Sequence, residues 1–230
     1  MKFLALDTSS NACSVALQVG DDVTTAHVVK PREHTAILIP MIEEILRVAG
    51  LALNDLDGII LGNGPGSFIG MRIAASVVQG LAFGAGLKVV PVSSLAAVAA
   101  ETFAAHDGTR VVVAQDAHMN EVYLAVFSRD SDGLPIAERE VCLHKVSACM
   151  VDDVGAAMLA AGSGWRLYPE LLEANQRFVE RDVDILYPNA RYLLRLGSRD
   201  WRAGQAIAPE QVVPEYVRMK VAEKPRPAAG

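Results

Sequence analysis

Hydrophobic and polar positions along the first hundred residues follow periods that predict alternating strands and helices. Three β-type runs open the chain, and the short polar breaks between them, 9–11 and 20–22, are interpreted as hairpin turns. The three runs cover residues 2–8, 12–19 and 23–30. The pattern then predicts a helix over 32–49, a strand over 58–62, a helix over 67–84, a strand over 88–92 and a helix over 93–104.

The pattern starts again after residue 105 and predicts a second unit. Strands are expected over 110–115, 121–128 and 135–143, and weaker helices over 151–161 and 188–199. We place a boundary at 106–108, which gives an N-terminal lobe over 1–105 and a C-terminal, degenerate lobe over 106–217. The remaining residues, 218–230, combine basic side chains with prolines and are expected to form a flexible tail.

The order of these elements predicts the fold class. In the first lobe it is β-β-β-α-β-α-β-α, so an antiparallel meander feeds a parallel α/β section. That order is typical of the ribonuclease-H-like unit that makes up each half of the actin and hexokinase class. We therefore expect an α/β, actin-like (ASKHA) fold of two lobes, the second abbreviated and with less parallel content.

Two predicted helices carry more apolar surface than one buried face requires. In the first, Leu38 and Ile42 belong to a helical stripe, but Ile37 and Ile39 lie off it and are apolar too. The second, over 67–84, has Arg72 as its only charge. Either it is buried inside its own domain, or its outer face docks on another protein. If it docks, the two helices predict a self-complementary patch and a homodimer in the absence of a partner.

Composition excludes some classes of protein. The hydrophobic fraction of 51% and mean hydropathy of +0.26 indicate a globular chain, and the longest uncharged run is too short to span a bilayer. A net charge of −6 argues against a protein that grips nucleic acid unaided, although it leaves a local basic patch open. Three cysteines without a CxxC pair indicate reduced thiols and a cytoplasmic protein.

Two motifs could hold a phosphate. Asp7, Thr8 and Ser9 follow the first strand, and Gly64 and Gly66 lie in a turn between a strand and a helix, where anions are often bound. The glycine turn is neither a P-loop nor a dinucleotide fingerprint. The alternative is that both segments are tight turns without a ligand, so nucleotide binding at these five residues is a weak prediction.

Other candidate chemistry is sparse. The five histidines include no pair spaced three or four apart, so no metal site is predicted. Asp116 and Glu121 flank a short segment between two predicted strands and could form a carboxylate pair, although a turn is the commoner explanation. The chain has no nucleophile elbow and no HExxH motif, so no catalytic residue is predicted.

Taken together, these segments resemble the TsaB (YeaZ) family over nearly the whole chain. The resemblance rests on Leu4-Ala5-Leu6-Asp7-Thr8-Ser9, Pro31-Arg32-Glu33-His34, Gly64-Pro65-Gly66-Ser67-Phe68, Gly70-Met71-Arg72, Gln79-Gly80-Leu81-Ala82, Asp116-Ala117, Met119, Glu121-Val122-Tyr123 and Pro214-Glu215-Tyr216-Val217-Arg218. It departs from the family at Ile69, usually Thr, at His118, usually Arg, and at Asn120, commonly Gly.

The resemblance implies a subunit of the bacterial machinery that makes N6-threonylcarbamoyladenosine at position 37 of ANN-reading tRNAs. Such a subunit is a non-catalytic relative of the transferase TsaD, binds TsaD, and forms a larger ATP-dependent assembly with TsaE. It implies no cofactor on this chain: ATP and a metal ion belong to the partner subunits, and tRNA is contacted only indirectly. The surface expected to meet the partner comprises Arg32, His34, Leu38, Ile42, Phe68, Met71, Arg72, Ala75 and Gln79.

Comparison with the catalytic relative supports a chain without a metal. When the glycine turns are aligned without a gap, the two metal-binding histidines of TsaD fall on Ser94 and Val98. Valine cannot ligate a metal, and a lone serine hydroxyl is a poor ligand. Two alternatives remain: an independent ATP-dependent transferase of the actin-like class, for which Asp7 is the only candidate carboxylate, and a glycoprotease-like peptidase.

Overall fold

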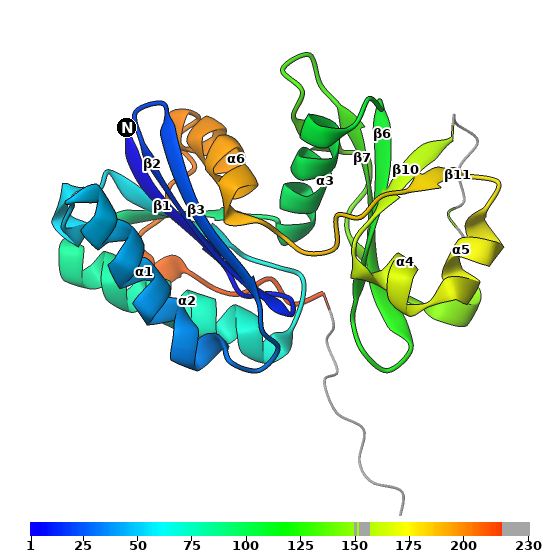
Figure 1. Cartoon of the computed structure of the whole chain (residues 1–230), viewed down its shortest axis with the longest axis horizontal. Helices are drawn as coiled ribbons and strands as arrows, with labels where there is room; N and C mark the ends of the chain where they lie inside the picture. The colour runs from blue at the N-terminus through cyan, green and yellow to red at the C-terminus, as the bar shows by residue number, and fades with distance from the viewer. Residues whose placement is uncertain (150, 152–156, 218–230) are drawn as a thin grey trace, which may run out of the picture.

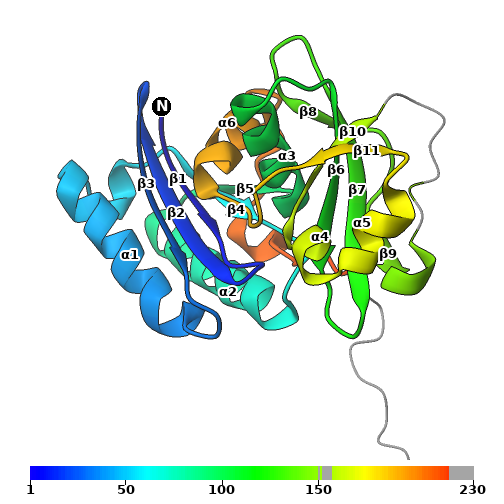
Figure 2. The same ribbon diagram turned by 45° about the vertical axis from the view of Figure 1, so that its right-hand side comes forward.

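The computed structural model describes residues 1–149, 151 and 157–217, and arranges them as two α/β units side by side (Figure 1). Each unit is built on one twisted sheet. Helix α3 (Ser94–Ala105) lies between the two sheets, which is also visible after a turn of 45° (Figure 2).

The first sheet has the strand order β3-β2-β1-β4-β5. Its first three strands form an antiparallel meander, and β4 and β5 run parallel to β1. The bounds are β1 (Lys2–Asp7), β2 (Ala12–Val19), β3 (Asp22–Val29), β4 (Gly58–Gly62) and β5 (Lys88–Val92). The meander and the parallel section confirm the predicted ribonuclease-H-like unit.

Helices cover both faces of the first sheet. On one face, Leu4 and Leu6 of β1 pack in the core beneath α1 (His34–Ala49) and α2 (Phe68–Ala85). On the other, Phe3 and Ala5 pack with α3 and α6 (Ala190–Arg202). Because successive side chains of a strand point to opposite faces, a doubly covered strand is apolar on both, as β1 is from Phe3 to Leu6.

The second sheet has the order β11-β10-β6-β7-β8, with β9 also paired to β7. Its strands are β6 (Arg110–Asp116), β7 (Glu121–Arg129), β8 (Pro135–Ala137), β9 (Cys142–Lys145), β10 (Met158–Ala161) and β11 (Val179–Asp182). One face packs against α3 and the other against the short helices α4 (Ser163–Leu167) and α5 (Pro169–Asn175). Three 3₁₀ turns complete the chain, at Leu53–Asp55, Val146–Ala148 and Pro209–Gln211.

Three expectations for the second lobe were wrong. The strand predicted over 135–143 is two short strands, β8 and β9, which pair with different parts of β7. Part of the helix predicted over 151–161 is the strand β10, while 152–156 lie outside the described residues. Parallel content is not reduced, because β6, β10 and β11 are parallel as β1, β4 and β5 are. The tail expected at 218–230 also lies outside the described residues.

The chain returns to the first sheet after crossing the second. Helix α6 packs on β1, β2, β4 and β5, although its sequence follows β11. Residues beyond it then run along α2, where Val212 joins the core of the first unit. We therefore propose a lobe boundary at 106–108 and a second one before α6, in place of a single C-terminal lobe over 106–217.

Candidate functional site

A cleft of about 930 Å³ separates the two units. The first unit lines it with the turn after β1 and the segment that leads into α1, including Arg32 and His34. The second unit contributes Gln115, Asp116 and His118 at the end of β6. In two-lobe proteins, ligands are often held in such clefts, so a nucleotide is the first ligand to consider for these walls.

The turn after β1 lies directly on the start of α2. The Thr8 hydroxyl donates to the Gly70 carbonyl at 2.7 Å, and the Ser67 amide donates to the Ser9 carbonyl at 2.6 Å. A Cβ atom at Gly66 or Gly70 would collide with the backbone of this turn, so the approach requires glycine. Of the amides at this helix start, those of Ser67 and Gly70 already have partners within the chain, the Ser9 carbonyl and the Ser67 hydroxyl.

Asp7 is 1% exposed, and both of its carboxylate oxygens have partners. Oδ1 accepts from the amide and hydroxyl of Ser9 at 2.8 and 2.7 Å, and Oδ2 accepts from the Ser94 hydroxyl at 2.6 Å. Burial raises the pKa of Asp7, and the hydrogen bonds from Ser94 and Ser9 oppose that rise. Ser94 also accepts from the Gly64 amide at 2.9 Å, which ties the carboxylate to the glycine turn.

The five predicted nucleotide residues are therefore close together. Both carboxylate oxygens of Asp7 accept hydrogen bonds from Ser9 and Ser94, and only Ser9 of the five lines the cleft, so this arrangement does not fit a bound metal–phosphate group. Ser94 and Val98 are fully buried, and Val98 belongs to the core of the second unit. Among the described residues, no three His, Cys, Asp or Glu side chains gather in a way that could hold a metal ion.

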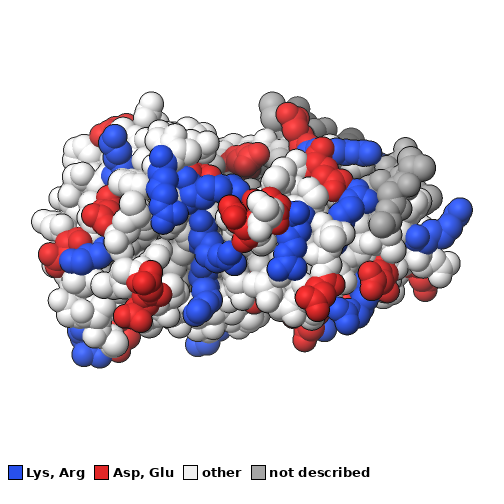
Figure 3. Space-filling model, turned by 90° about the horizontal axis from the view of Figure 1, so that it is seen from above, with Lys and Arg blue, Asp and Glu red and all other residues white. Residues whose placement is uncertain are grey.

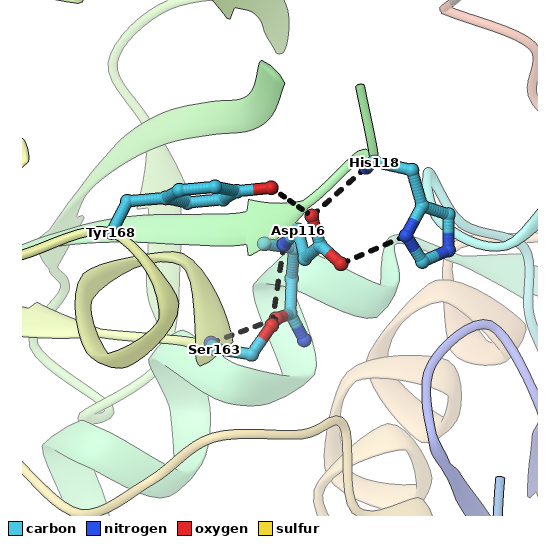
Figure 4. Close-up of polar contacts among 5 residues, drawn as sticks. Asp116, His118, Ser163 and Tyr168 are labelled. Carbon is cyan, nitrogen blue, oxygen red and sulfur yellow. Dashed lines mark hydrogen bonds and ion pairs between the residues drawn. The ribbon is translucent and has the colours of Figure 1, made fainter. Parts of the chain in front are cut away.

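A polar network forms the opposite wall of the cleft (Figure 4). Asp116 accepts from the Tyr168 hydroxyl at 2.9 Å and lies 3.0 Å from the His118 ring. Burial, and then the bond to Asp116, raise the pKa of Tyr168 to about 12. The Ser163 hydroxyl donates to Gln115 at 2.6 Å and accepts from the Asp116 amide, so it makes no relay with His118. The network joins β6 to α4 and α5 and offers no activated nucleophile.

An apolar groove of about 400 Å³ runs between α1 and α2 on the outer surface of the first unit. Ile39, Ile69, Ile73 and Val77 line it. Ile69 is 70% exposed, and Phe83, further along α2, is 71% exposed. Of the described helices, α2 alone is long and apolar enough to cross a membrane by length and composition, and it lies against the first sheet through one face.

The structure divides the nine residues expected at the partner surface. Arg32 and Arg72 are exposed, and Phe68 and Gln79 are half-buried. The others are buried within this chain: His34, Leu38, Ile42, Met71 and Ala75. Of these, His34 and Leu38 line the apolar groove, as Phe68 and Arg72 do, so the structure corrects the assignment to a surface for Ile42, Met71 and Ala75. The sequence showed that both helices are apolar on more than one side, but it did not indicate which positions face outward.

Three of the predicted residues, Phe68, Arg72 and Gln79, contact the segment after α6, whose role the sequence did not indicate. The Arg72 guanidinium stacks on Phe68 at 3.7 Å, and its Nε donates to the Tyr216 hydroxyl at 2.9 Å. Gln79 donates to the Val212 carbonyl at 3.1 Å. The segment after α6 thus holds one side of α2. In the sequence this segment was marked only by its resemblance to the family at Pro214-Glu215-Tyr216-Val217-Arg218, which gave no contact for it.

Comparisons with known proteins agree with this architecture. Residues 28–150 match the family described as "TsaD: tRNA N6-adenosine threonylcarbamoyltransferase". The chain is 37% identical to the tRNA threonylcarbamoyladenosine biosynthesis protein TsaB of Haemophilus influenzae over 99% of this chain and 98% of that protein. It is 36% identical to the Escherichia coli TsaB over 99% of both chains. The crystal structure of YeaZ from Pseudomonas aeruginosa matches with a TM-score of 0.86 at 36% identity, covering 94% of this chain and 99% of that one.

Proposed function

This chain belongs to the TsaB family of tRNA threonylcarbamoyladenosine biosynthesis proteins, and we propose that it is the non-catalytic subunit that binds and activates the transferase TsaD. The observation that carries the proposal is the apolar outer face of α1 and α2. We call this the docking surface and define it by Ile39, Ile69, Ile73, Val77 and Phe83.

The composition of the docking surface favours a protein partner. Large apolar side chains that are 70% exposed, as Ile69 is, commonly mark an interface. Between them α2 presents Ser76, Gly80 and Gly84 to solvent, and such small residues let another helix approach closely. TsaD is the partner we propose, with TsaE joining through the TsaB–TsaD assembly. In the absence of TsaD, the same surface would pair with a second copy, so homodimer and heterodimer would compete.

The closed turn after β1 supports a role without chemistry. Asp7 accepts hydrogen bonds from Ser9 and Ser94, and the Ser67 amide at the start of α2 donates to the Ser9 carbonyl. We propose that ATP and the metal ion act on the partner subunits in the cytoplasm. Binding of this chain would then activate TsaD by favouring its active conformation, since a ligand shifts an equilibrium toward the state it binds more tightly.

Two isoleucine variants test the docking surface. Ile69→Arg places a charge on it, and we expect at least tenfold weaker co-elution with TsaD and less modified adenosine formed by the reconstituted complex. Ile136→Arg is the matched control, because Ile136 is 51% exposed on β8 of the second sheet, and it should behave as the native chain. The proposal is wrong if Ile69→Arg binds TsaD normally, if this chain alone modifies tRNA, or if the other subunits are fully active without it.

A further inference from the structure

Every exposed residue of α6 is an arginine. The helix runs from Ala190 to Arg202, and its solvent-facing positions are occupied by Arg191, Arg195, Arg199 and Arg202, which we call the arginine stripe. The remaining residues of the helix are buried or half-buried. An exposed helix face usually mixes charges of both signs, so a face of one sign in a chain of net charge −6 is unexpected.

The stripe is poorly neutralised by the rest of the molecule. Arg199 lies 3.1 Å from Asp200, and Arg195 donates only to the backbone carbonyl of Asp132, at 3.3 Å. In the described part of the chain, no ion pair joins Arg191, Arg195 or Arg202 to a carboxylate. Arginines four apart repel one another, and Arg191 lies at the positive end of the helix dipole. The free helix therefore carries an electrostatic cost that a bound anion would remove.

The stripe is held rigidly beside a groove. Leu193, Leu194 and Leu196 of the same helix are buried in the core, and the Ala190 amide donates to the Ser14 hydroxyl at 2.9 Å. A groove of about 420 Å³ runs along the arginines. Seen from above, Lys and Arg side chains gather in the middle of the face on which α6 lies (Figure 3).

We propose that the arginine stripe binds the phosphate backbone of tRNA directly. Its four guanidinium groups are spread over roughly 16 Å of helix, which suits a run of phosphates better than a single anion. Guanidinium binds phosphate through two parallel hydrogen bonds, which an ammonium cannot do. The choice of tRNA rests on the family assignment. It replaces the expectation that tRNA is contacted only indirectly. The net charge of −6 argued against direct binding, but a net charge averages over the whole surface and does not exclude a local basic patch.

The test measures binding of the full-length chain to an unmodified ANN-reading tRNA transcript by fluorescence anisotropy. The stripe variant carries Arg191→Gln, Arg195→Gln and Arg202→Gln. The control carries Arg47→Gln, Arg139→Gln and Arg177→Gln, which are exposed arginines elsewhere and remove the same charge. We expect the stripe variant to bind at least tenfold more weakly at low salt, and its plot of log affinity against log salt to be shallower by about 2. The control should stay within about threefold of the native chain.

Three further measurements keep the result interpretable. Thermal unfolding should show that the stripe variant is folded and no less stable than the native chain. Arg195→Lys should keep the salt dependence and lose affinity, because charge remains while paired hydrogen bonding is lost. Polyglutamate at the same ionic strength should bind more weakly than tRNA. Equal binding of polyglutamate, or unchanged tRNA affinity of a folded stripe variant, overturns the inference.

Failure of this inference is distinguishable from failure of the proposed function. The docking surface and α6 lie on opposite faces of the first sheet, so the stripe variant should co-elute with TsaD as the native chain does. A native chain that binds tRNA through the stripe but does not bind TsaD upholds this inference and overturns the proposed function. If the native chain binds TsaD normally but the stripe variant binds tRNA as the native chain does, the proposed function stands and this inference is wrong.

Discussion

Asp7 shows what a single position can and cannot reveal. Its place at the end of the first strand was predictable, and so was its proximity to the glycine turn at the end of a parallel neighbour. Ser94, whose hydroxyl donates to the second carboxylate oxygen, lies 87 residues away at the start of α3. No local pattern indicates that bond, although it determines whether the carboxylate faces a ligand or the interior. The chemistry of this site was therefore the least predictable part of it.

Glu101 on α3 provides a prediction at the same scale. Burial raises the pKa of this carboxyl from its ordinary 4.5 to about 7. The folded chain therefore binds a proton that the unfolded chain has released, and stability falls as the pH rises from about 4.5 to 7. The full linkage would be about 3 kcal/mol, and solvent screening of a half-buried group reduces it to about 1–2 kcal/mol.

Glu101→Gln should remove most of this pH dependence. We expect the variant to be more stable than the native chain at pH 8 by about 1–2 kcal/mol, and to differ little at pH 4.5, where the native carboxyl is protonated. Urea unfolding at both pH values measures the effect. Glu173→Gln, at an exposed position on α5, is the control and should leave the pH profile unchanged. An unaltered profile in Glu101→Gln would refute the assignment.

Element by element, the sequence was most informative in the first unit. Strands and helices there are bounded by glycine and polar turns, and their predicted bounds agree with the structure to within one or two residues. In the second unit, β10 is only four residues long, Met158–Ala161, and fully buried. A short apolar run rich in alanine has no period that separates a buried strand from a helix, which explains the wrong assignment.

The sequence alone predicts part of the arrangement of α6, namely the helix face that carries the arginines. Arg191, Arg195 and Arg199 recur at four-residue spacing, and the leucines between them recur on the other side, so an amphipathic helix could be predicted. Its position on the first sheet could not, because the packing depends on Gly197, where the helix backbone meets Ile60 of β4.

Two glycine substitutions with opposite expected signs test helix packing. A Cβ at Gly197 would lie 2.6 Å from side-chain carbons of Ile60, so Gly197→Ala should destabilise the chain by about 1–3 kcal/mol. Gly80 of α2 has no atom within 4 Å of that position, so Gly80→Ala should stabilise it by about 0.5–1 kcal/mol through helix propensity. Chemical unfolding measures both. Stabilisation by both substitutions would show that α6 does not pack this closely.

At the scale of the whole molecule, α3 joins the two units. Ala97 and Ala100 belong to the core shared with the first sheet, whereas Leu95 and Phe103 belong to the core of the second. The sequence predicted a helix over 93–104 and placed it in the first lobe. In the structure this helix is covered on both sides, and a helix covered on both sides must be apolar on both sides.

The last prediction follows from this shared helix: the two units unfold together. The chain has two tryptophans, and they report on different units, since Trp201 packs edge-to-face with Phe3 at 5.2 Å between ring centroids, while Trp165 lies in the core of the second unit. Chains carrying Trp165→Phe or Trp201→Phe therefore report on one unit each by fluorescence.

Within each single-tryptophan chain, fluorescence and far-UV circular dichroism should give one coincident urea transition. Adding Phe103→Ala should lower the free energy of unfolding by about 3–5 kcal/mol, whichever tryptophan reports it. The substitution leaves a cavity beside α3, and α3 is part of both cores. Ile136→Ala truncates an exposed side chain of the second sheet and should shift neither signal. If Phe103→Ala moved the Trp165 signal and left the Trp201 signal in place, the units would be separate folding domains, and α3 would belong to only one of them.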